Sequence, residues 1–408
     1  MRRTHIHRSS PYRLPLNRLL ILPALALLAT GCETEPPKIG AVLPLSGADE
    51  GIGQSSKRGL ELALEELAAE GSQLQLVFED SQSDPEEAGR KLGTLIRDGK
   101  ALAAVGAVTP GEAEAMAPVA EELEHVLLSP SAGNQQLSAK TRHFYRLAPA
   151  DSTAGSTLAT FAAKDLKATS AVMISENAGW GAALEEGFRP IFEGQNGEVL
   201  ESLEAPSAEA DLTTAVEQVG TAKPDAVVLA GYGDWLTTAI RQLRSSGYEG
   251  RVLTTQTIAN KAQLQSLKGQ LRGVLFSHSP FIDVERPETQ KFLDAYRTKY
   301  NEEPDIFAAE AYDTLKVLAL ALEGRPQLAS EVRRGLRDAV KDHPGATGNL
   351  EFDDTGSVSK FPRVYSADAD GALFDYGDQL AALEEERRKK MKEIQERLQA
   401  LQSQASSM

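Results

Sequence analysis

The sequence predicts an α/β protein built on parallel β-sheets, and three observations support this prediction. Short apolar runs alternate with longer amphipathic segments over residues 38–277, an order of strands and helices that is typical of parallel sheets covered on both faces. The runs are apolar almost without interruption, as expected for strands buried on both sides. Beyond its N-terminal apolar segment, the chain is long enough for two domains of ordinary size.

The expected strands are the short apolar runs themselves. They cover residues 39–43, 74–79, 102–106, 126–129, 171–175, 199–203, 226–230, 252–255 and 274–277. Two more strands are expected near residues 350–352 and 363–365, after a glycine-rich turn. The sheets should therefore form mostly from the first two thirds of the chain.

The expected helices are the amphipathic segments between these strands. They cover residues 54–70, 85–98, 153–167, 181–193, 212–219 and 235–245, followed by 287–300, 304–323 and 329–341. Thr109, Pro110 and Glu112 combine a hydroxyl N-cap, a proline at the first helical position and an acid three residues after the cap, which is a capping box. Residues 84–87 repeat this pattern with Asp84 as the cap.

The composition changes after Tyr376. Residues 379–402 contain no Gly or Pro, are rich in Glu, Lys and Arg, and place Met391, Ile394, Leu398 and Leu401 at helical spacing. A long amphipathic helix is therefore expected within a charged tail of residues 377–408. Two interpretations are open: residues 377–402 bind a helical partner, or they form a solvated helix of the chain itself.

The N-terminus has the features of an export signal. Arg2 and Arg3 precede an uncharged apolar core at residues 19–29, and small residues follow it. The core is too short to span a bilayer. Residues 28–32 resemble a bacterial lipobox, which implies a signal peptide over residues 1–31 and a lipid anchor on Cys32 in the cell envelope. The alternative is an ordinary cleaved signal with an incidental cysteine, and both interpretations place the protein outside the cytoplasm.

Composition excludes several classes of function. The formal net charge is -16, with 59 acidic and 43 basic residues, which does not suit binding to nucleic acid. Cys32 is the only cysteine, so no internal disulfide can form. The six histidines are scattered, and we expect no metal and no cofactor. The sequence contains no Gly-x-Ser-x-Gly elbow and no phosphate-binding loop, so no motif of this kind points to an enzyme.

Five segments resemble the periplasmic substrate-binding proteins of the branched-chain amino acid type. They are residues 38–47 (KIGAVLPLSG), 80–85 (DSQSDP), 128–132 (LSPSA), 310–314 (EAYDT) and 345–353 (GATGNLEFD), and they occur in the order of that family. The resemblance covers the chain from residue 38 to about residue 376. It implies the type I periplasmic-binding-protein fold: two similar doubly wound parallel-sheet lobes, joined by three hinge crossings, that close around a ligand.

The resemblance also implies a division of the chain. Lobe 1 is expected at residues 38–148 and 281–345, and lobe 2 at residues 149–280 and 346–376, with crossings near Pro149, Pro280 and Gly345. The charged tail at residues 377–408 lies outside the resemblance. The implied partners are a small-molecule ligand and an ABC permease or a sensor.

The resemblance places ligand-binding residues on the loops of lobe 1 that follow its strands. Ser46, Thr109, Ser131, Ala132 and Gly133 are the candidates there. Ligands of open parallel sheets collect beyond the carboxyl ends of the strands, where helix N-termini offer free N–H groups to a carboxylate. This chain departs from the family at two positions, because Pro110 has no N–H and Gly133 replaces a common Thr. Thr109 is open to two interpretations, a ligand contact or a cap for its own helix.

In lobe 2 the resemblance points to Trp180, Tyr232 and Gln256. The two aromatic rings would form an apolar wall with a polar edge. Gln256 lies where amino-acid receptors carry the acid that pairs with the ligand ammonium, and a neutral amide disfavours an ordinary α-amino acid unless Glu176 or Asp234 supplies the charge. The expected ligand is therefore an amino acid, an amide or a small carboxylate. The alternatives are an envelope scaffold or sensor with a degenerate cleft and, less favoured, an enzyme.

Overall fold

The computed structural model describes residues 35–176, 178–206, 210–279, 286–358 and 360–406, without the side chains of 178, 210–211 and 398–406. The expected signal peptide, Cys32 with its lipid anchor and the crossing at Pro280 lie outside these residues. Residues from Pro37 onward form one compact unit. Within it the strands form two main sheets, which define lobe 1 and lobe 2.

Lobe 1 contains a five-stranded sheet in the order β2-β1-β3-β4-β5, and every pair in it is parallel. Its strand β1 alternates between two apolar layers: Ile39, Ala41 and Leu43 join one core cluster, and Val42 joins the other. The sheet is therefore covered on both faces, as expected for parallel strands. The strands are β1 (Lys38–Leu43), β2 (Gln75–Asp80), β3 (Ala103–Val105), β4 (Val126–Ser129) and β5 (Phe144–Arg146).

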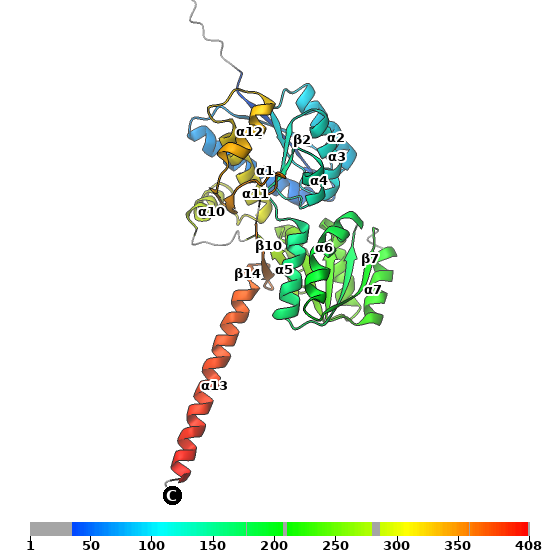
Figure 1. Ribbon diagram of the computed structural model, residues 1–408, viewed down its shortest axis with the longest axis vertical. Helices are drawn as coiled ribbons and strands as arrows, with labels where there is room; N and C mark the ends of the chain where they lie inside the picture. The colour runs from blue at the N-terminus through cyan, green and yellow to red at the C-terminus, as the bar shows by residue number, and fades with distance from the viewer. Residues whose placement is uncertain (1–34, 177, 207–209, 280–285, 359, 407–408) are drawn as a thin grey trace, which may run out of the picture. The chain divides into compact units, whose positions relative to one another are not determined.

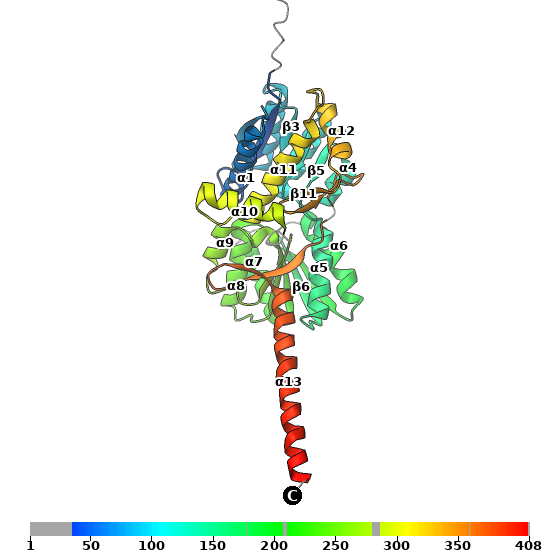
Figure 2. The ribbon, with the colours of Figure 1, turned by 90° about the vertical axis from the view of Figure 1, so that its left-hand side faces the viewer.

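The helices of lobe 1 come from two distant parts of the chain, coloured blue to cyan and yellow to orange in Figure 1. The first part contributes α1 (Glu50–Ala69), α2 (Pro85–Arg97), α3 (Pro110–Glu122) and α4 (Gln135–Lys140), and the second α10 (Pro287–Tyr300), α11 (Ile306–Leu322) and α12 (Ala329–Ala339). Figure 2 shows α1 beside α11. A Cβ on Gly59 would lie 2.0 Å from the carbonyl oxygen of Ala308, so only glycine allows these helices to approach so closely.

Lobe 2 contains a seven-stranded sheet in the order β14-β13-β10-β9-β8-β6-β7. The five strands from β10 to β7 are parallel to one another, whereas β13 pairs antiparallel with β10, and β14 pairs antiparallel with β13. The strands are β6 (Ser170–Ser175), β7 (Glu198–Glu204), β8 (Ala226–Ala230), β9 (Arg251–Thr255), β10 (Val274–His278), β13 (Arg363–Ala367) and β14 (Leu373–Asp375). The predicted fold class, two lobes with doubly wound parallel sheets, is confirmed.

The helices of lobe 2 alternate with its parallel strands. They are α5 (Asp151–Lys164), α6 (Ala178–Glu193), α7 (Ala210–Ala222), α8 (Gly233–Ser245) and α9 (Lys261–Ser266), with a short 3-10 helix at Gln256–Ile258. Helices α5 and α6 pack closely. A Cβ on Gly187 of α6 would lie only 1.8 Å from the carbonyl oxygen of Ser152 on α5, so glycine is needed at this contact.

The third crossing between the lobes lies later in the chain than the expected position at Gly345. The hairpin of β11 (His343–Gly345) and β12 (Gly348–Leu350) is anchored on lobe 1, because Asp313 of α11 accepts the N–H groups of Ala346 and Thr347 at 2.8 Å. Residues 356–358 then bond to Arg146 at the end of β5. The chain therefore stays with lobe 1 to Val358 and enters lobe 2 before β13.

The C-terminal helix α13 (Tyr376–Ser406) confirms the expected helical tail and begins three residues earlier than the predicted span. Its Leu383, Met391 and Ile394 are 49–55% exposed. The side chains of Leu398 and Leu401 lie outside the described residues, so the expected apolar stripe is seen only in part. Within the described part of the chain, no helix combines the length and apolar character needed to cross a membrane.

Candidate functional site

A small cavity of about 30 Å³ lies between the two lobes. Lobe 1 contributes Ser131 and Gly133 to its wall, and lobe 2 contributes Tyr232 and Gln256. Asp151, the first residue of α5, also belongs to the wall. A space of this size holds a water molecule rather than an amino acid. Four of the eight expected site residues therefore line one cavity, and Ser46, Thr109, Ala132 and Trp180 do not belong to its wall.

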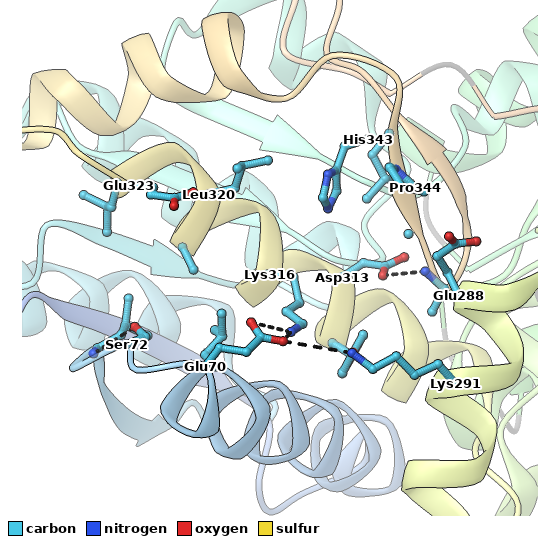
Figure 3. Close-up of a pocket in the computed structure, with 18 of the residues that line it drawn as sticks. Glu70, Ser72, Glu288, Lys291, Asp313, Lys316, Leu320, Glu323, His343 and Pro344 are labelled. Carbon is cyan, nitrogen blue, oxygen red and sulfur yellow. Dashed lines mark hydrogen bonds and ion pairs between the residues drawn. The ribbon is translucent and has the colours of Figure 1, made fainter.

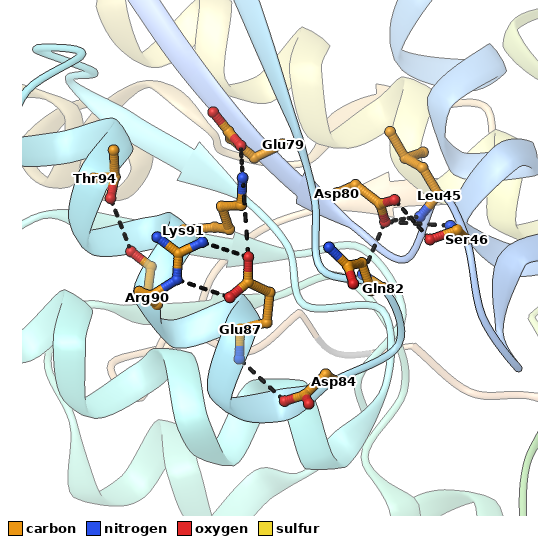
Figure 4. A network of polar contacts seen from close by, with 10 residues as sticks. All are labelled: Leu45, Ser46, Glu79, Asp80, Gln82, Asp84, Glu87, Arg90, Lys91 and Thr94. Carbon is orange, nitrogen blue, oxygen red and sulfur yellow. Dashed lines mark hydrogen bonds and ion pairs between the residues drawn. The ribbon is translucent and has the colours of Figure 1, made fainter.

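Ser46 is held by Asp80, the last residue of β2, and does not face the cavity. Its hydroxyl donates to Asp80 Oδ2 at 2.7 Å, and the N–H groups of Leu45 and Ser46 donate to Asp80 Oδ1 at 2.9 and 3.2 Å (Figure 4). Burial opposes ionisation of Asp80, but these hydrogen bonds prevail and lower its pKa. The acidic turn after β2 therefore fixes the loop that follows β1, and the Ser46 hydroxyl is engaged in that loop.

Thr109 caps its own helix. Its hydroxyl accepts the N–H of Glu112 at 3.4 Å, as the capping-box pattern predicts. The Glu112 carboxylate accepts from Val108 N at 3.3 Å and from the Ser81 hydroxyl at 2.5 Å, and the backbone N–H of Thr109 also favours its ionised form. Of the two interpretations of Thr109, the structure shows the cap. Burial raises the pKa of Glu112 to about 7.

The loop after β4 carries Ser131, Ala132 and Gly133. The hydroxyl of Ser131 donates to the carbonyl oxygen of Val108 at 2.8 Å, which ties this loop to the one that precedes α3. A Cβ on Gly133 would lie 2.2 Å from Asp151 Oδ1. Glycine is therefore needed here because the carboxylate of Asp151 occupies the adjacent space. Burial raises the pKa of Asp151 to about 6, and the nearby guanidinium of Arg146 acts in the opposite direction.

Trp180 and Tyr232 pack against each other in lobe 2. Their ring centroids are 4.6 Å apart with the planes tilted by 37°. Trp180 is 3% exposed and Tyr232 is 8% exposed. The N–H of Tyr232 donates to Glu176 Oε2 at 3.1 Å, which links the loops that follow β6 and β8. Of the two aromatic residues expected at the cleft, only Tyr232 lies in the wall of the cavity.

Gln256 bridges the lobes. Its amide Nε2 donates to both carboxylate oxygens of Glu310 on α11, at 3.0 and 3.1 Å, and its Oε1 accepts from the N–H of Ser279 at 3.2 Å. Both ends of the amide are thus engaged within the protein. Gln256 acts here as a contact between lobe 2 and lobe 1.

Glu310 belongs to a buried group of charges beside the crossings. Lys360 donates to the Thr347 hydroxyl at 2.7 Å and lies near both Glu310 and Asp313. Burial raises the pKa of Glu310 to about 7, and the charge of Lys360 opposes this shift. Sequence reasoning quoted Glu310 as part of a family motif but assigned it no role, and it did not find Asp151. An acidic residue at a helix start carries no sign in the sequence that it will be buried.

A larger hollow lies elsewhere, on lobe 1. It has a volume of about 640 Å³ and is lined by the end of α1, by α11 and by the hairpin of β11 and β12. Figure 3 shows that Glu70 reaches Lys316 and Lys291 across it, with an oxygen to nitrogen distance of 3.3 Å to Lys316 and 4.0 Å to Lys291. Both lysines of this hollow are paired with Glu70, and its wall comes from a single lobe. We therefore take the smaller cavity between the lobes as the candidate site.

Comparison with known proteins is consistent with this architecture. The family model described as periplasmic binding protein matches residues 36–371. A relative in Pseudomonas aeruginosa, a leucine-, isoleucine-, valine-, threonine- and alanine-binding protein, is 22% identical over 355 residues, which cover 85% of this chain and 94% of the relative.

Two solved structures show the same fold. One is the branched-chain amino acid transporter substrate binding protein LivJ from Streptococcus pneumoniae in complex with isoleucine, with a TM-score of 0.75 and 26% identity over 83% of this chain and 97% of that chain. The other is a solute binding protein of an ABC transporter from R. palustris in complex with benzoate, with a TM-score of 0.75 and 21% identity over 83% of this chain and 95% of that chain. The matched family and these proteins are binding proteins and not enzymes. The chain therefore belongs to the periplasmic binding protein family, among relatives of the branched-chain amino acid type.

Proposed function

We propose that this protein captures a small solute in the cleft between its lobes and delivers it to an ABC transporter. The observation that carries the proposal is the cavity whose wall is shared by Ser131 and Gly133 of lobe 1 and by Tyr232 and Gln256 of lobe 2. A ligand held by both lobes favours the closed arrangement over an open one, because only the closed arrangement provides both sets of contacts. The named relatives, which bind amino acids or benzoate, support the same kind of activity.

The cavity of about 30 Å³ must enlarge before it accepts a solute. Trp180 and Tyr232 are the side chains that we expect to move, because Tyr232 lines the cavity and the ring of Trp180 packs against it. A solute that takes the place of one ring keeps an apolar wall on the other.

We further propose that the protein works outside the cytoplasm and is held at a membrane by lipid on Cys32. The lipobox-like residues 28–32 and the basic and apolar segments before them support this anchor. The measurement is mass spectrometry of the N-terminal peptide from the exported protein. A diacylated Cys32 is the expected result, and a peptide with a free thiol contradicts the anchor.

A second candidate is a scaffold or sensor protein with a degenerate cleft. The observations in its favour are the small volume of the cavity and the engagement of Thr109 and Gln256 within the protein. The exposed side chains of α13 would then serve a helical partner. Ligand binding decides between the two candidates.

Thermal unfolding with a library of small solutes tests the proposal. A solute at a hundred times its Kd stabilises the folded state by about 2.7 kcal/mol, which raises the Tm by several degrees. Trp180→Ala and Tyr232→Ala should each abolish this rise. Phe78→Ala is the matched control, because it removes a half-buried aromatic ring of lobe 1 that is not in the cavity wall.

Fluorescence gives a second readout. Trp180 and Trp235 are the two tryptophans of the chain, so Trp235→Phe leaves Trp180 as the only reporter at the cleft. We expect the emission of this variant to change saturably with the same solute. If no solute raises the Tm of a folded preparation or changes this emission, the scaffold or sensor function replaces solute capture.

A further inference from the structure

Three carboxylates from both lobes lie close enough for their charges to act on one another. Asp49 precedes α1 in lobe 1, whereas Glu176 follows β6 and Asp234 lies in the first turn of α8 in lobe 2. Asp49 Oδ1 is 3.0 Å from the position that a Cβ on Gly233 would take, so the Asp49 side chain reaches across to lobe 2. Asp49 occupies the N-cap position of α1 but makes no side-chain hydrogen bond to it. Asp49 and Asp234 also line a common cavity of about 250 Å³.

These carboxylates have no cationic partner among the residues that the structure describes. No ion pair there involves Asp49, Glu176 or Asp234, and the two buried cations near the cleft are engaged elsewhere. Arg146 donates to the carbonyl oxygen of Ala148 at 3.1 Å, and Lys360 donates to the Thr347 hydroxyl. Burial raises the pKa of Asp49, and the charge of Asp234 adds to this effect, as expected for like charges brought together.

The hydroxyl of Tyr232 provides an independent observation. Tyr232 is 8% exposed and lines the cavity, and in the described part of the chain its hydroxyl makes no hydrogen bond. Burial raises its pKa, and the charges of Asp151, Asp49 and Glu176 raise it further. The hydroxyl oxygen is not fully buried, so a ligand can reach its free hydrogen-bonding capacity beside these negative charges.

The loops of lobe 1 lack the hydrogen-bond donors that would bind a carboxylate. Pro110 has no N–H, Gly133 has no hydroxyl, and the Thr109 hydroxyl accepts from its own helix. The carboxylate of Asp151 lies 2.2 Å from the position of a Gly133 Cβ. An anionic ligand at this loop would thus lie beside the negative charge of Asp151 and would find no hydrogen-bond donors from these side chains.

We propose that the cleft binds an organic cation, with its protonated amine or guanidinium group between Asp49, Glu176 and Asp234 and its carbon skeleton against the ring of Tyr232. This inference rests on the proposed function, because it assumes that the cleft captures a solute. A cation offsets the repulsion that closure of the lobes creates among the carboxylates. Aromatic rings also attract cations over their faces.

An organic cation fits better than a metal ion. Among the described residues no group of three or more His, Cys, Asp or Glu side chains converges in a way that could hold a metal. Asp49 and Asp234 line a cavity of about 250 Å³ together with Gly233, whereas Asp151 lines the cavity of about 30 Å³ together with Tyr232, the residue before Gly233 in the chain. This separation suits an extended molecule with a charge at one end.

Isothermal titration calorimetry of the full chain tests the inference with five probes. Putrescine, agmatine and choline are organic cations, isoleucine is a zwitterion and benzoate is an anion. We expect at least one cation to bind at least tenfold more tightly than isoleucine and benzoate, and its affinity to fall as salt is added. Asp49→Asn and Asp234→Asn should each weaken the bound cation at least tenfold, and Asp354→Asn, an exposed carboxylate outside the cleft, should not.

The Tm of each variant without ligand shows whether it is folded. We expect Asp49→Asn to keep or raise this Tm, because it removes repulsion with Asp234. Tight binding of isoleucine or benzoate that is unchanged in Asp49→Asn overturns the inference and leaves solute capture intact. If none of the five probes binds and no solute of the wider library raises the Tm, both proposals fail.

Discussion

Gln256→Glu tests the contact between the lobes. The substitution restores an acid at the position where, by resemblance, amino-acid receptors carry one. In this structure, however, the new carboxylate would replace an amide nitrogen that lies 3.0 and 3.1 Å from the two oxygens of Glu310. The structure therefore predicts loss of stability rather than gain of amino-acid binding.

The magnitude follows from the two interactions that change. A hydrogen bond to a charged group contributes about 1.5–3 kcal/mol, and this contribution is lost. Two buried carboxylates also repel each other, although the nearby ammonium of Lys360 offsets part of this repulsion. We expect the free energy of unfolding to fall by about 2–4 kcal/mol near pH 8.

The loss should depend on pH. Burial already raises the pKa of Glu310 to about 7, and a second carboxylate at residue 256 would raise the pKa of the pair further. The folded state would then hold a proton that the unfolded chain, with ordinary glutamates, releases above about pH 5. Stability is therefore retained near pH 5 and is lost as the pH rises toward 8.

Urea unfolding followed by fluorescence at several pH values measures this effect. Gln265→Glu is the matched control, because Gln265 is exposed on α9, and the change there should cost less than about 0.5 kcal/mol at every pH. If Gln256→Glu is as stable as the parent near pH 8, or loses the same free energy near pH 5, the contact between Gln256 and Glu310 does not exist as described.

Three other predictions concern parts of the fold around the site. Burial raises the pKa of Glu112 to about 7, so stability falls as the pH rises from about 5 to about 7, where the unfolded chain has released this proton and the folded state still holds it. Urea unfolding of Glu112→Gln should show a smaller loss of stability over this range than the parent, and an unchanged slope contradicts the burial. Gly133→Ala should lower the unfolding free energy by about 1–3 kcal/mol through contact with Asp151, and an unchanged Tm would refute this contact. Deletion of residues 381–408 removes exposed helix, so calorimetry should find the Tm within about 2 °C of the parent, and a larger fall means that α13 packs on the lobes.

The strongly patterned elements were predictable from the sequence. The strands at Ala226–Ala230 and Val126–Ser129 have the predicted bounds, because each is a short apolar run that the sheet buries entirely. The short elements β5, β11, β14, α4 and α9 were missed, since three to six residues carry too little periodicity to distinguish them from loops. The third crossing was expected too early in the chain. The hydrogen bond from Arg146 to Gly356 keeps this segment on lobe 1, and it joins residues too far apart in the chain to be predicted from sequence pattern.

The candidate site was predictable in position more than in chemistry. Tyr232, Gln256, Ser131 and Gly133 line one cavity because all of them follow strands at the facing ends of the sheets. Their hydrogen-bond partners were not predictable. The contact of Gln256 with Glu310 spans the two lobes, and the need for Gly133 depends on Asp151, so both become visible only once the chain is folded.

A crystal structure of the full chain with the solute that most raises its Tm tests the central claim most directly. The account predicts the solute between the lobes, in contact with Tyr232 of lobe 2 and with the loop of Ser131 in lobe 1, with the ring of Trp180 or Tyr232 displaced. A solute bound in the larger hollow beside α1 and α11, with the space between the lobes unchanged, would contradict it.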